Sequence, residues 1–277
     1  MASLMHQGRA SYAFFERNWN LTKRYWGWEV VWLFYNIINA LSVTLISKNT
    51  TLLNKVSQSD IDSLTLYLLI GTSVWSYLSV TFEGVTDVIN IERWEGTIEH
   101  TFMAPISRIT QMIGSCWYAV VHGMLFTFVQ LIIVASFFRL NLSHANYLTA
   151  VFMLLLGSAS FIGFGIGAAV LPLLYTERGS QMSFIVRAII LLVSGVYYPI
   201  QALPGWMQPA ASISPATYVL NGLREALLNN RPIWSPDIWA NTWPLLISGV
   251  ISIPLGLWIF GIAERYAKKT GRLKRNG

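Results

Sequence analysis

Six long apolar runs constrain the fold of this chain more than any other feature of its sequence. They cover residues 27–47, 64–86, 109–138, 147–175, 182–200 and 240–263. Because a helix of about 20 apolar residues crosses the hydrocarbon core of a bilayer, each run is long enough to span one. We therefore expect an all-α membrane protein with six transmembrane helices.

The low content of charge supports this fold class. Charged residues make up 12% of the chain and hydrophobic residues 54%, whereas soluble domains carry about 25% charged residues. A surface so poor in charge is expected to be covered largely by lipid. The spans and their connections use most of the chain, so we expect one transmembrane domain over residues 1–277. No room remains for a separate soluble domain of about 100 residues.

The positions of Lys and Arg predict the orientation of the spans. If both ends of the chain lie on one side of the membrane, that side holds most of the 19 basic residues. Cytoplasmic connections carry such an excess, so we expect a multi-pass protein of the cytoplasmic (inner) membrane with both termini in the cytoplasm. The anionic headgroups of the lipid bilayer explain basic side chains at its borders. Nucleic acid is therefore not expected as a partner.

Residues 1–26 have the pattern of an amphipathic helix. One face of that helix carries aromatic residues, namely Tyr12, Phe15, Trp19 and Trp26. Arg17 and Arg24 fall on the opposite face. The pattern favours a helix that lies in the cytoplasmic interface of the membrane. The alternative is a frayed, basic tail.

Residues 90–103, between the second and third spans, predict a short cytoplasmic helix that ends before Pro105. One face would carry three carboxylates, those of Glu92, Glu95 and Glu99. A separate face would carry three apolar side chains, those of Trp94, Ile98 and Phe102. Such a helix suits docking into a cytoplasmic partner. The alternatives are a solvated run of charges and a catalytic carboxylate pair, but nothing predicts the apolar pocket that would raise the pKa of one carboxylate.

Residues 201–230, before the last span, fit neither a span nor a solvated loop. Pro199 directly precedes the region and prolines interrupt it at positions 204, 209 and 215, yet it is rich in apolar residues. Non-helical backbone at membrane depth requires protein or a wet cavity to satisfy its polar groups, so we expect short helices that re-enter the outer leaflet. There Leu203, Trp206 and Leu220 would be buried, with Arg224 and Glu225 at a wet edge. The alternative is an amphipathic extracellular loop that lies on the headgroups.

Three ionisable residues fall at or within the spans. Glu83 and Asp87 share a helical face near the cytoplasmic end of the second span, and Arg187 lies inside the fifth. Because burial of charge in lipid is costly, such residues are functional candidates. We hypothesise that they form a network at the inner mouth of a transport pathway. The alternative is that each side chain snorkels to nearby headgroups.

Several familiar motifs are absent or have simpler explanations. The sequence contains no Gly-x-x-x-x-Gly-Lys-Ser/Thr, so any ATP hydrolysis would take place on another polypeptide. The glycines between Gly163 and Gly167 lie inside an apolar run and predict close helix packing. The four histidines lack zinc spacing, and His122 is expected to make a hydrogen-bonded contact between helices.

Two of these segments resemble the ABC type-2 exporter permease family. Residues 92–99 (Glu-Arg-Trp-Glu-Gly-Thr-Ile-Glu), followed by Ala-Pro-Ile-Ser-Arg at 104–108, are similar to its cytoplasmic coupling-helix signature. Residues 194–206 resemble the segment after its fifth span, where the chain re-enters the outer leaflet as two short helices. At Ser214-Pro215 the family usually has Asn-Pro. The resemblance covers nearly the whole chain and is closest to drug-resistance and lipo-oligosaccharide exporters.

The resemblance implies roles for specific residues. The residues that would couple to an ATPase are Glu92, Arg93, Trp94, Glu95, Gly96, Thr97, Glu99 and Phe102. Those of the re-entrant gate are Tyr197, Tyr198, Pro199, Leu203, Pro204, Trp206 and Pro215. The implied partners are two copies of a separate ABC ATPase subunit, which would hold ATP and magnesium, and a second copy of this permease or a related permease. The chain itself is expected to hold no cofactor or metal and no catalytic site.

The function expected from these features is export of an amphiphilic substrate, such as a drug, a lipid or a lipid-linked glycan. Spans with few charges and many aromatic residues suit such a cargo. One alternative is a permease for polysaccharide or teichoic acid. A remote alternative is an intramembrane lipid-modifying enzyme, which would need clustered His, Asp or Glu at one depth. A channel would need a ring of charges or carbonyls, and none is legible in the sequence.

Overall fold

A computed structural model of the chain describes residues 4–49, 58–104, 106–138, 145–175 and 178–271. Pro105, which was predicted to end the coupling helix, lies outside the described residues, as does part of the connection after the first span. The described elements, in chain order, are α1 Leu4–Arg24, α2 Trp26–Asn49, α3 Gln58–Thr86, α4 Val88–Trp94, α5 Ile98–Met103, α6 Arg108–Phe138, α7 Tyr147–Ala168, α8 Val170–Leu174, α9 Gly179–Val193, η2 Ile200–Ala202, α10 Gln208–Ile213, α11 Pro215–Leu228 and α12 Pro236–Lys269.

The all-α membrane fold is confirmed. Among the described residues, five helical segments are long and apolar enough to cross a membrane, namely Trp26–Ile46, Ser63–Thr86, Ile109–Phe138, Tyr147–Leu174 and Pro236–Lys269. The sixth, α9, is apolar but only 15 residues long. The predicted fifth span over 182–200 is therefore wrong at its C-terminal end. The helix stops at Val193 because Gly195 adopts a left-handed backbone with φ of 68°, and Pro199 follows in extended conformation.

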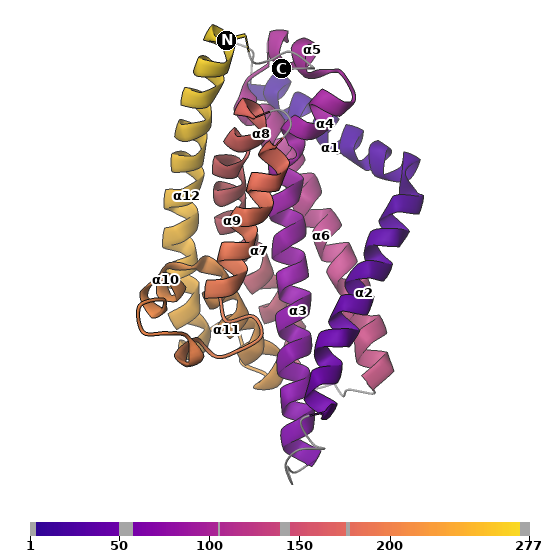
Figure 1. Ribbon diagram of the computed structural model, residues 1–277, viewed down its shortest axis with the longest axis vertical. Helices are drawn as coiled ribbons and strands as arrows, with labels where there is room; N and C mark the ends of the chain where they lie inside the picture. The colour runs from indigo at the N-terminus through magenta and orange to yellow at the C-terminus, as the bar shows by residue number, and fades with distance from the viewer. Residues whose placement is uncertain (1–3, 50–57, 105, 139–144, 176–177, 272–277) are drawn as a thin grey trace.

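The long helices run side by side, and two groups of short helices lie at opposite ends of the bundle (Figure 1). The upper end of Figure 1 carries α1, α4, α5 and the C-terminal end of α12. Helices α10 and α11 lie in the lower half, while α2 and α3 extend further down. We call these two regions the upper end and the lower end. The two segments that the sequence singled out therefore lie at opposite ends of the molecule.

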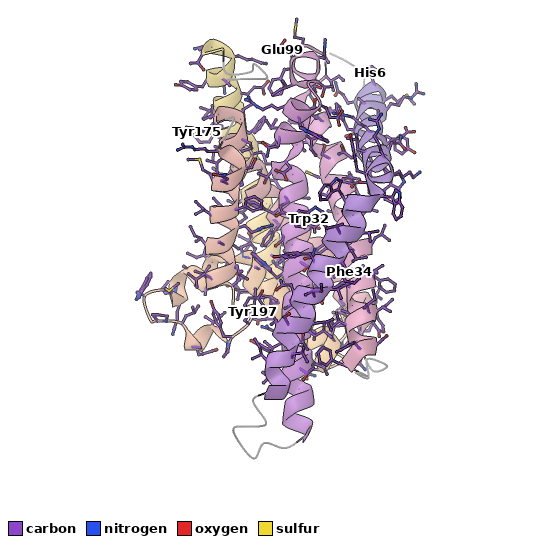
Figure 2. All side chains as sticks on the ribbon, turned by 45° about the vertical axis from the view of Figure 1, so that its right-hand side comes forward. His6, Trp32, Phe34, Glu99, Tyr175 and Tyr197 are labelled. Atoms are coloured by element: carbon purple, nitrogen blue, oxygen red, sulfur yellow. The ribbon has the colours of Figure 1, made fainter. Side chains whose placement is uncertain are left out.

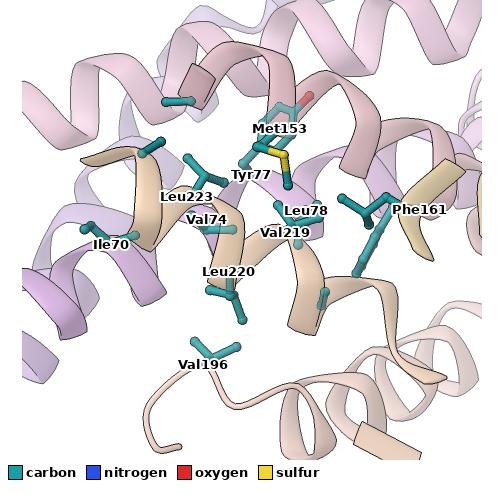
Figure 3. Close-up of a cluster of buried hydrophobic side chains, with 14 of the residues drawn as sticks. Ile70, Val74, Tyr77, Leu78, Met153, Phe161, Val196, Val219, Leu220 and Leu223 are labelled. Atoms are coloured by element: carbon teal, nitrogen blue, oxygen red, sulfur yellow. The ribbon is translucent and has the colours of Figure 1, made fainter. Parts of the chain in front are cut away.

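The main apolar core joins α3, α7, α11 and α12 (Figure 3). Leu220 and Val219 of α11 are fully buried in it, as are Tyr77 of α3 and Met153 of α7. A second core at the upper end joins the end of α3 to α5, α6, α8 and α12, and it includes Ile98 and Phe102. Each end of the bundle thus has its own apolar cluster beneath its short helices.

Small residues allow α7 and α12 to approach closely, as the glycine-rich run predicted. A Cβ atom on Gly163 would overlap Ser252, and one on Gly256 would meet the backbone of Gly163. Two serine hydroxyls cross the same contact, since Ser160 Oγ donates to the Leu245 carbonyl at 3.0 Å and Ser252 Oγ to the Ser160 carbonyl at 3.2 Å. Close packing and interhelical hydrogen bonds are the usual means of association between helices in membranes.

Apolar side chains cover much of the outside of the bundle. Trp32 and Phe34 of α2 are 57% and 64% exposed and project outward at mid-height (Figure 2). Lipid is the natural cover for such a surface. The amphipathic helix predicted over 1–26 is present as α1, which packs on α6, where Ser11 Oγ donates to the Thr110 carbonyl at 2.7 Å. Its placement in the membrane interface stays a prediction.

Candidate functional site

The predicted coupling helix over 90–103 is divided into two helices, which corrects the expectation of one continuous helix. Helix α4 ends at Trp94, and α5 begins at Ile98. Between them Gly96 has φ of 73°, a conformation that glycine adopts at little steric cost. The backbone closes around this break, because the Thr97 N–H donates to the Glu92 carbonyl at 2.9 Å. Glu92, Glu95 and Glu99 therefore do not share one helical face.

Glu92 is the centre of a buried polar cluster at the upper end. Its carboxylate is 1% exposed and forms an ion pair with Arg17 of α1. It also accepts hydrogen bonds from Thr97 Oγ1 at 2.5 Å, Thr101 Oγ1 at 2.8 Å and Gln111 Nε2 at 3.3 Å. We call these five residues the Glu92 cluster. A buried carboxylate requires such partners, since burial of an unpaired charge is strongly unfavourable.

The Glu92 cluster joins the consecutive helices α4, α5 and α6 to α1, which is distant in sequence. Arg17 comes from α1, Glu92 from α4, Thr101 from α5 and Gln111 from α6. The sequence placed Arg17 on the face of an interfacial helix opposite its aromatic residues. In the structure its side chain reaches the buried carboxylate and is 31% exposed. The sequence signal was weak, since nothing in the pattern distinguished Arg17 from Arg24.

Two other predicted coupling residues also face inward. Arg93 is 6% exposed, and its Nη2 donates to the carbonyl of Leu173 in α8 at 2.9 Å. Burial lowers the pKa of this guanidinium. Phe102 packs in the upper core with Ile98. The predicted apolar face is therefore split, because Ile98 and Phe102 are buried within this chain while Trp94 is 68% exposed.

The outward residues of this region form a small surface at the upper end, which we call the α4–α5 surface. It consists of Trp94, Glu95, Glu99, His100 and Met103. Met103 is 85% exposed, and Glu99 lies at the upper tip in Figure 2. The Trp94 ring lies 5.7 Å from the ring of Tyr25, which follows α1. Exposed Trp and Met side chains with carboxylates between them are suited to contact with another protein.

The ionisable residues of the spans are only partly joined. Glu83 of α3 and Arg187 of α9 form an ion pair, and the Arg187 guanidinium lies 4.9 Å from the centroid of the Phe184 ring. Asp87 lines the same crevice but accepts a hydrogen bond from Asn90 Nδ2 at 2.7 Å. Burial raises the pKa of Asp87. The structure thus brings Glu83 and Arg187 together, while their role in a pathway stays a prediction.

At the lower end, Arg224 of α11 holds the turn that follows α9. Its Nη2 donates to the carbonyls of Gly195 and Val196 at 3.2 and 3.0 Å. The guanidinium carbon lies 3.5 Å from the centroid of the Tyr67 ring, a cation–π contact with α3. Arg224 is half-buried and also lines an open polar cavity with Asn221 and Glu225, so its expected place at a wet edge stays a prediction. The side chain thus links the turn after α9 to α3 and α11.

The structure divides the predicted gate residues. Leu203 and Leu220 are buried as expected, at 7% and 0% exposed. Trp206 is 80% exposed, so the expectation that it is buried is wrong. Pro215 is buried at the start of α11, and Pro199 and Pro204 are exposed. Tyr197 and Tyr198 are half-buried, and the Tyr198 hydroxyl donates to the Leu192 carbonyl.

One interhelical charge contact was missed by sequence reasoning. His122 Nε2 of α6 lies 3.1 Å from Glu29 Oε2 in the first turn of α2. The expected helix contact of His122 is thereby confirmed, but its partner was not identified. The sequence signal for this partner was Glu29 itself, a lone carboxylate inside an apolar run. Among the described residues, no group of three His, Cys, Asp or Glu side chains is placed to hold a metal ion.

Comparison with known proteins assigns a family. The profile of the family described as ABC-2 type transporter matches residues 10–228. Two relatives are the probable doxorubicin resistance ABC transporter permease protein DrrC of Mycobacterium tuberculosis, 25% identical over 172 residues, and ABC transporter G family member 20 of Dictyostelium discoideum, 24% identical over 112 residues. These matches cover 60% and 40% of this chain but 59% and 15% of the relatives. The matches thus cover less than two thirds of either relative.

Proposed function

This chain belongs to the ABC-2 type transporter family, and from that premise we propose that it is the permease subunit of an ATP-driven exporter of amphiphilic substrates. The family implies an ABC ATPase partner, and the sequence has no P-loop of its own. Two permease chains would line a pathway, and two ATPase subunits would dock at the upper end. The chain would then lie in the inner membrane, with its upper end facing the cytoplasm.

The observation that best supports this proposal is the α4–α5 surface and the way it is held. Trp94 and Met103 are exposed at the upper end, although apolar side chains of this size are costly to leave in water. Directly beneath them, the Glu92 cluster ties α4 and α5 to α1 and α6. A force applied to this surface by an ATPase would therefore reach a spanning helix and α1 together. Coupling requires that ATP bind the two states of the transporter with different affinity.

The Glu83–Arg187 pair would take part in that change. It joins α3 to α9, which is the shortest of the predicted spanning helices. If the pathway opens between these helices, the pair would separate in one state and re-form in the other. Neutralising either residue should then alter transport without removing the ATPase.

The composition of the spanning helices is the basis for the proposed substrate class. These helices carry few charges and many aromatic residues, which suits an apolar or amphiphilic cargo. One relative is named for doxorubicin resistance, and doxorubicin is therefore a reasonable first probe. The experiment is ATP-dependent uptake of doxorubicin into inside-out vesicles that contain the permease and its co-expressed ATPase.

Reversal of one charge and introduction of another on the α4–α5 surface test the docking part of the proposal. The variant Glu99→Lys combined with Met103→Glu should leave ATP hydrolysis but abolish uptake, because the ATPase would no longer move the spans. Glu16→Lys on the exposed side of α1 is the matched control for charge reversal at the same end. The amount of chain in the membrane is measured for each variant. Unchanged uptake by the double variant would exclude this surface as the contact.

A further inference from the structure

A cavity of about 200 Å³ lies beneath α1, between that helix and the ends of α2, α3, α4 and α6. It shares Trp94 and Glu95 with the edge of the α4–α5 surface, whereas no residue of α5 and no residue of the Glu83–Arg187 crevice lines it. A water molecule occupies about 30 Å³ in the liquid. The cavity therefore has room for a group of several heavy atoms, but not for a whole lipid or drug.

The lining of this cavity carries an excess of negative charge. It includes the carboxylates of Glu29, Glu92 and Glu95 but a single guanidinium, that of Arg17. Arg17 is already paired with Glu92, whereas Glu29 contacts His122 Nε2 at 3.1 Å and has no Lys or Arg partner among the described residues. Within the part of the chain that the structure describes, no cationic side chain pairs with Glu95. Two carboxylates thus remain to meet a positive charge inside the cavity.

Aromatic rings form the remaining walls. Tyr25 and Trp94 stand 5.7 Å apart at one side. Tyr118 lines the other side, where its hydroxyl bonds to Thr22 and its ring stacks on His122 at 5.3 Å. Aromatic faces attract organic cations through the ring quadrupole, most strongly where water is excluded. Rings and carboxylates around one small space are the chemistry that recognises an ammonium group.

The depth of the cavity indicates where its occupant comes from. Glu29 lies in the first turn of α2, Gly84 near the end of α3 and Tyr118 well inside α6. All three helices are long and apolar enough to span a membrane. The space therefore opens among membrane helices below the exposed tip of α5. An amphiphile whose tail lies in lipid can place its head group here, whereas an ATPase side chain would have to pass beneath α1.

The surroundings select against an anionic head group. Lys23 and Arg24 at the end of α1 are exposed and would attract phosphates to the outer surface. The carboxylates inside the cavity would repel the same phosphates. A positively charged head is the one type that both the lining charge and the aromatic walls favour.

We propose that the cavity beneath α1 is a binding site for the ammonium head group of an amphiphile, with Glu29 and Glu95 as its charge partners and Tyr25, Trp94 and Tyr118 as its aromatic walls. The ammonium can belong to a membrane lipid, such as phosphatidylethanolamine, or to a cationic amphiphile that is to be transported. Binding of this kind requires neither ATP nor the ATPase. Its failure would therefore leave the proposed export function untouched.

The test uses a fluorescent pair of probes that differ only in charge. The purified permease is placed in nanodiscs of phosphatidylglycerol, and energy transfer from tryptophan to trimethylammonium-diphenylhexatriene or to uncharged diphenylhexatriene is titrated. Empty nanodiscs supply the background from partition into lipid. We expect a saturable component for the cationic probe and none for its uncharged parent.

Substitutions test whether the saturable binding of the cationic probe takes place in this cavity. Glu29→Gln combined with Glu95→Gln should weaken binding of the cationic probe by about tenfold or more, which corresponds to about 1.4 kcal/mol. Glu16→Gln removes a carboxylate from the exposed side of α1 and should leave the affinity unchanged. Thermal unfolding of each variant in the same nanodiscs verifies that it is folded. Absence of a saturable component, or equal affinity in the wild type and the double variant, would overturn the proposal.

Lipid composition then identifies the source of the ammonium. In nanodiscs that contain phosphatidylethanolamine, competition for the site would raise the apparent dissociation constant of the probe in the wild type but not in the double variant. That result assigns the site to a lipid head group. An equal affinity in both lipids, with the effect of the double variant retained, assigns it to a cationic amphiphile of another kind.

Discussion

The upper and lower ends of the molecule each hold a group of short helices, but they hold them by different means. At the upper end, a buried carboxylate accepts hydrogen bonds from side chains of α1, α5 and α6. At the lower end, the guanidinium of Arg224 donates to two backbone carbonyls, and α11 itself belongs to the main apolar core. The upper end thus combines a buried polar cluster with its own apolar core, whereas the lower end depends mainly on burial of apolar surface.

The difference bears on what each end can do. A polar cluster has few members and a fixed geometry, so its loss separates the helices that it joins. An apolar core is distributed over many contacts and resists small displacements. We infer that the upper end can change its arrangement as a unit, whereas the lower end forms a stable wall. The following substitutions test this contrast, from the largest expected effect to the smallest.

Arg17→Ala should be the most damaging change to stability. It would leave the carboxylate of Glu92, which is 1% exposed, buried with only neutral donors. Loss of one partner from a buried ion pair costs about 3–5 kcal/mol. Thermal unfolding of the purified permease measures the effect. Glu92→Gln should cost less, because Arg17 is 31% exposed and can regain water.

A double variant separates the contribution of the Arg17–Glu92 ion pair to stability from that of the surrounding contacts. Arg17→Ala with Glu92→Gln should be more stable than Arg17→Ala alone, since no buried charge is left without a partner. If the two single effects simply add, the ion pair is not the link between α1 and α4. In that case the upper end would be held as the lower end is, by packing.

Leu220→Ala should show how far the lower end depends on its apolar core. Leu220 is fully buried between α11 and the main core, and such a truncation costs about 2–5 kcal/mol through lost contacts and a residual cavity. Unfolding in detergent measures it, with Leu228→Ala at the exposed end of the same helix as the control. Equal stability of the two variants would show that α11 is not anchored by this core.

Gly96→Ala should disturb the upper end by a smaller amount. Alanine at a φ of 73° is strained by about 1–2 kcal/mol, so the break between α4 and α5 would be less favoured. We expect a modest loss of stability together with a clear loss of ATP-driven uptake, because the α4–α5 surface would shift. Gly27→Ala, where a Cβ meets nothing within 4 Å, is the matched control. Normal uptake by the Gly96 variant would mean that the break is not needed for coupling.

Trp206→Ala should have the smallest effect on stability, within about 0.5 kcal/mol, since exposed side chains away from special features contribute little. The side chain is 80% exposed at the lower end. If the re-entrant segment gates the pathway, uptake should fall while the protein level stays normal. A large loss of stability would instead show that Trp206 packs against another chain or against lipid.

The sequence predicted the fold class and the places of interest because both depend on composition and spacing. Long apolar runs specify helices in a bilayer, and prolines 199 to 215 marked the region of short helices at the lower end. The pattern of carboxylates at 92, 95 and 99 failed because it assumed a continuous helix. A glycine with positive φ at position 96 separates α4 from α5, so the residues after it belong to a second helix with its own faces.

Contacts between distant helices were beyond the reach of the pattern. Arg17 and Glu92 are 75 residues apart, and His122 and Glu29 are 93 apart. Their pairing depends on how α1 packs against α4 and how α2 packs against α6, which a single sequence does not specify. The burial of Trp206 was inferred from its apolar character alone. Tryptophan has a polar tip and is common at membrane borders, so an exposed position satisfies it equally well.

The short length of α9 has a consequence for the bilayer itself. Its 15 residues rise about 22 Å at 1.5 Å per residue, whereas the hydrocarbon core of a typical bilayer is about 30 Å thick. Such hydrophobic mismatch is relieved by local thinning of the membrane beside the helix. The lipids along α9 would therefore be compressed, and a head group would have a shorter apolar distance to cross there. Transport should then depend on acyl-chain length, and be fastest in thin membranes.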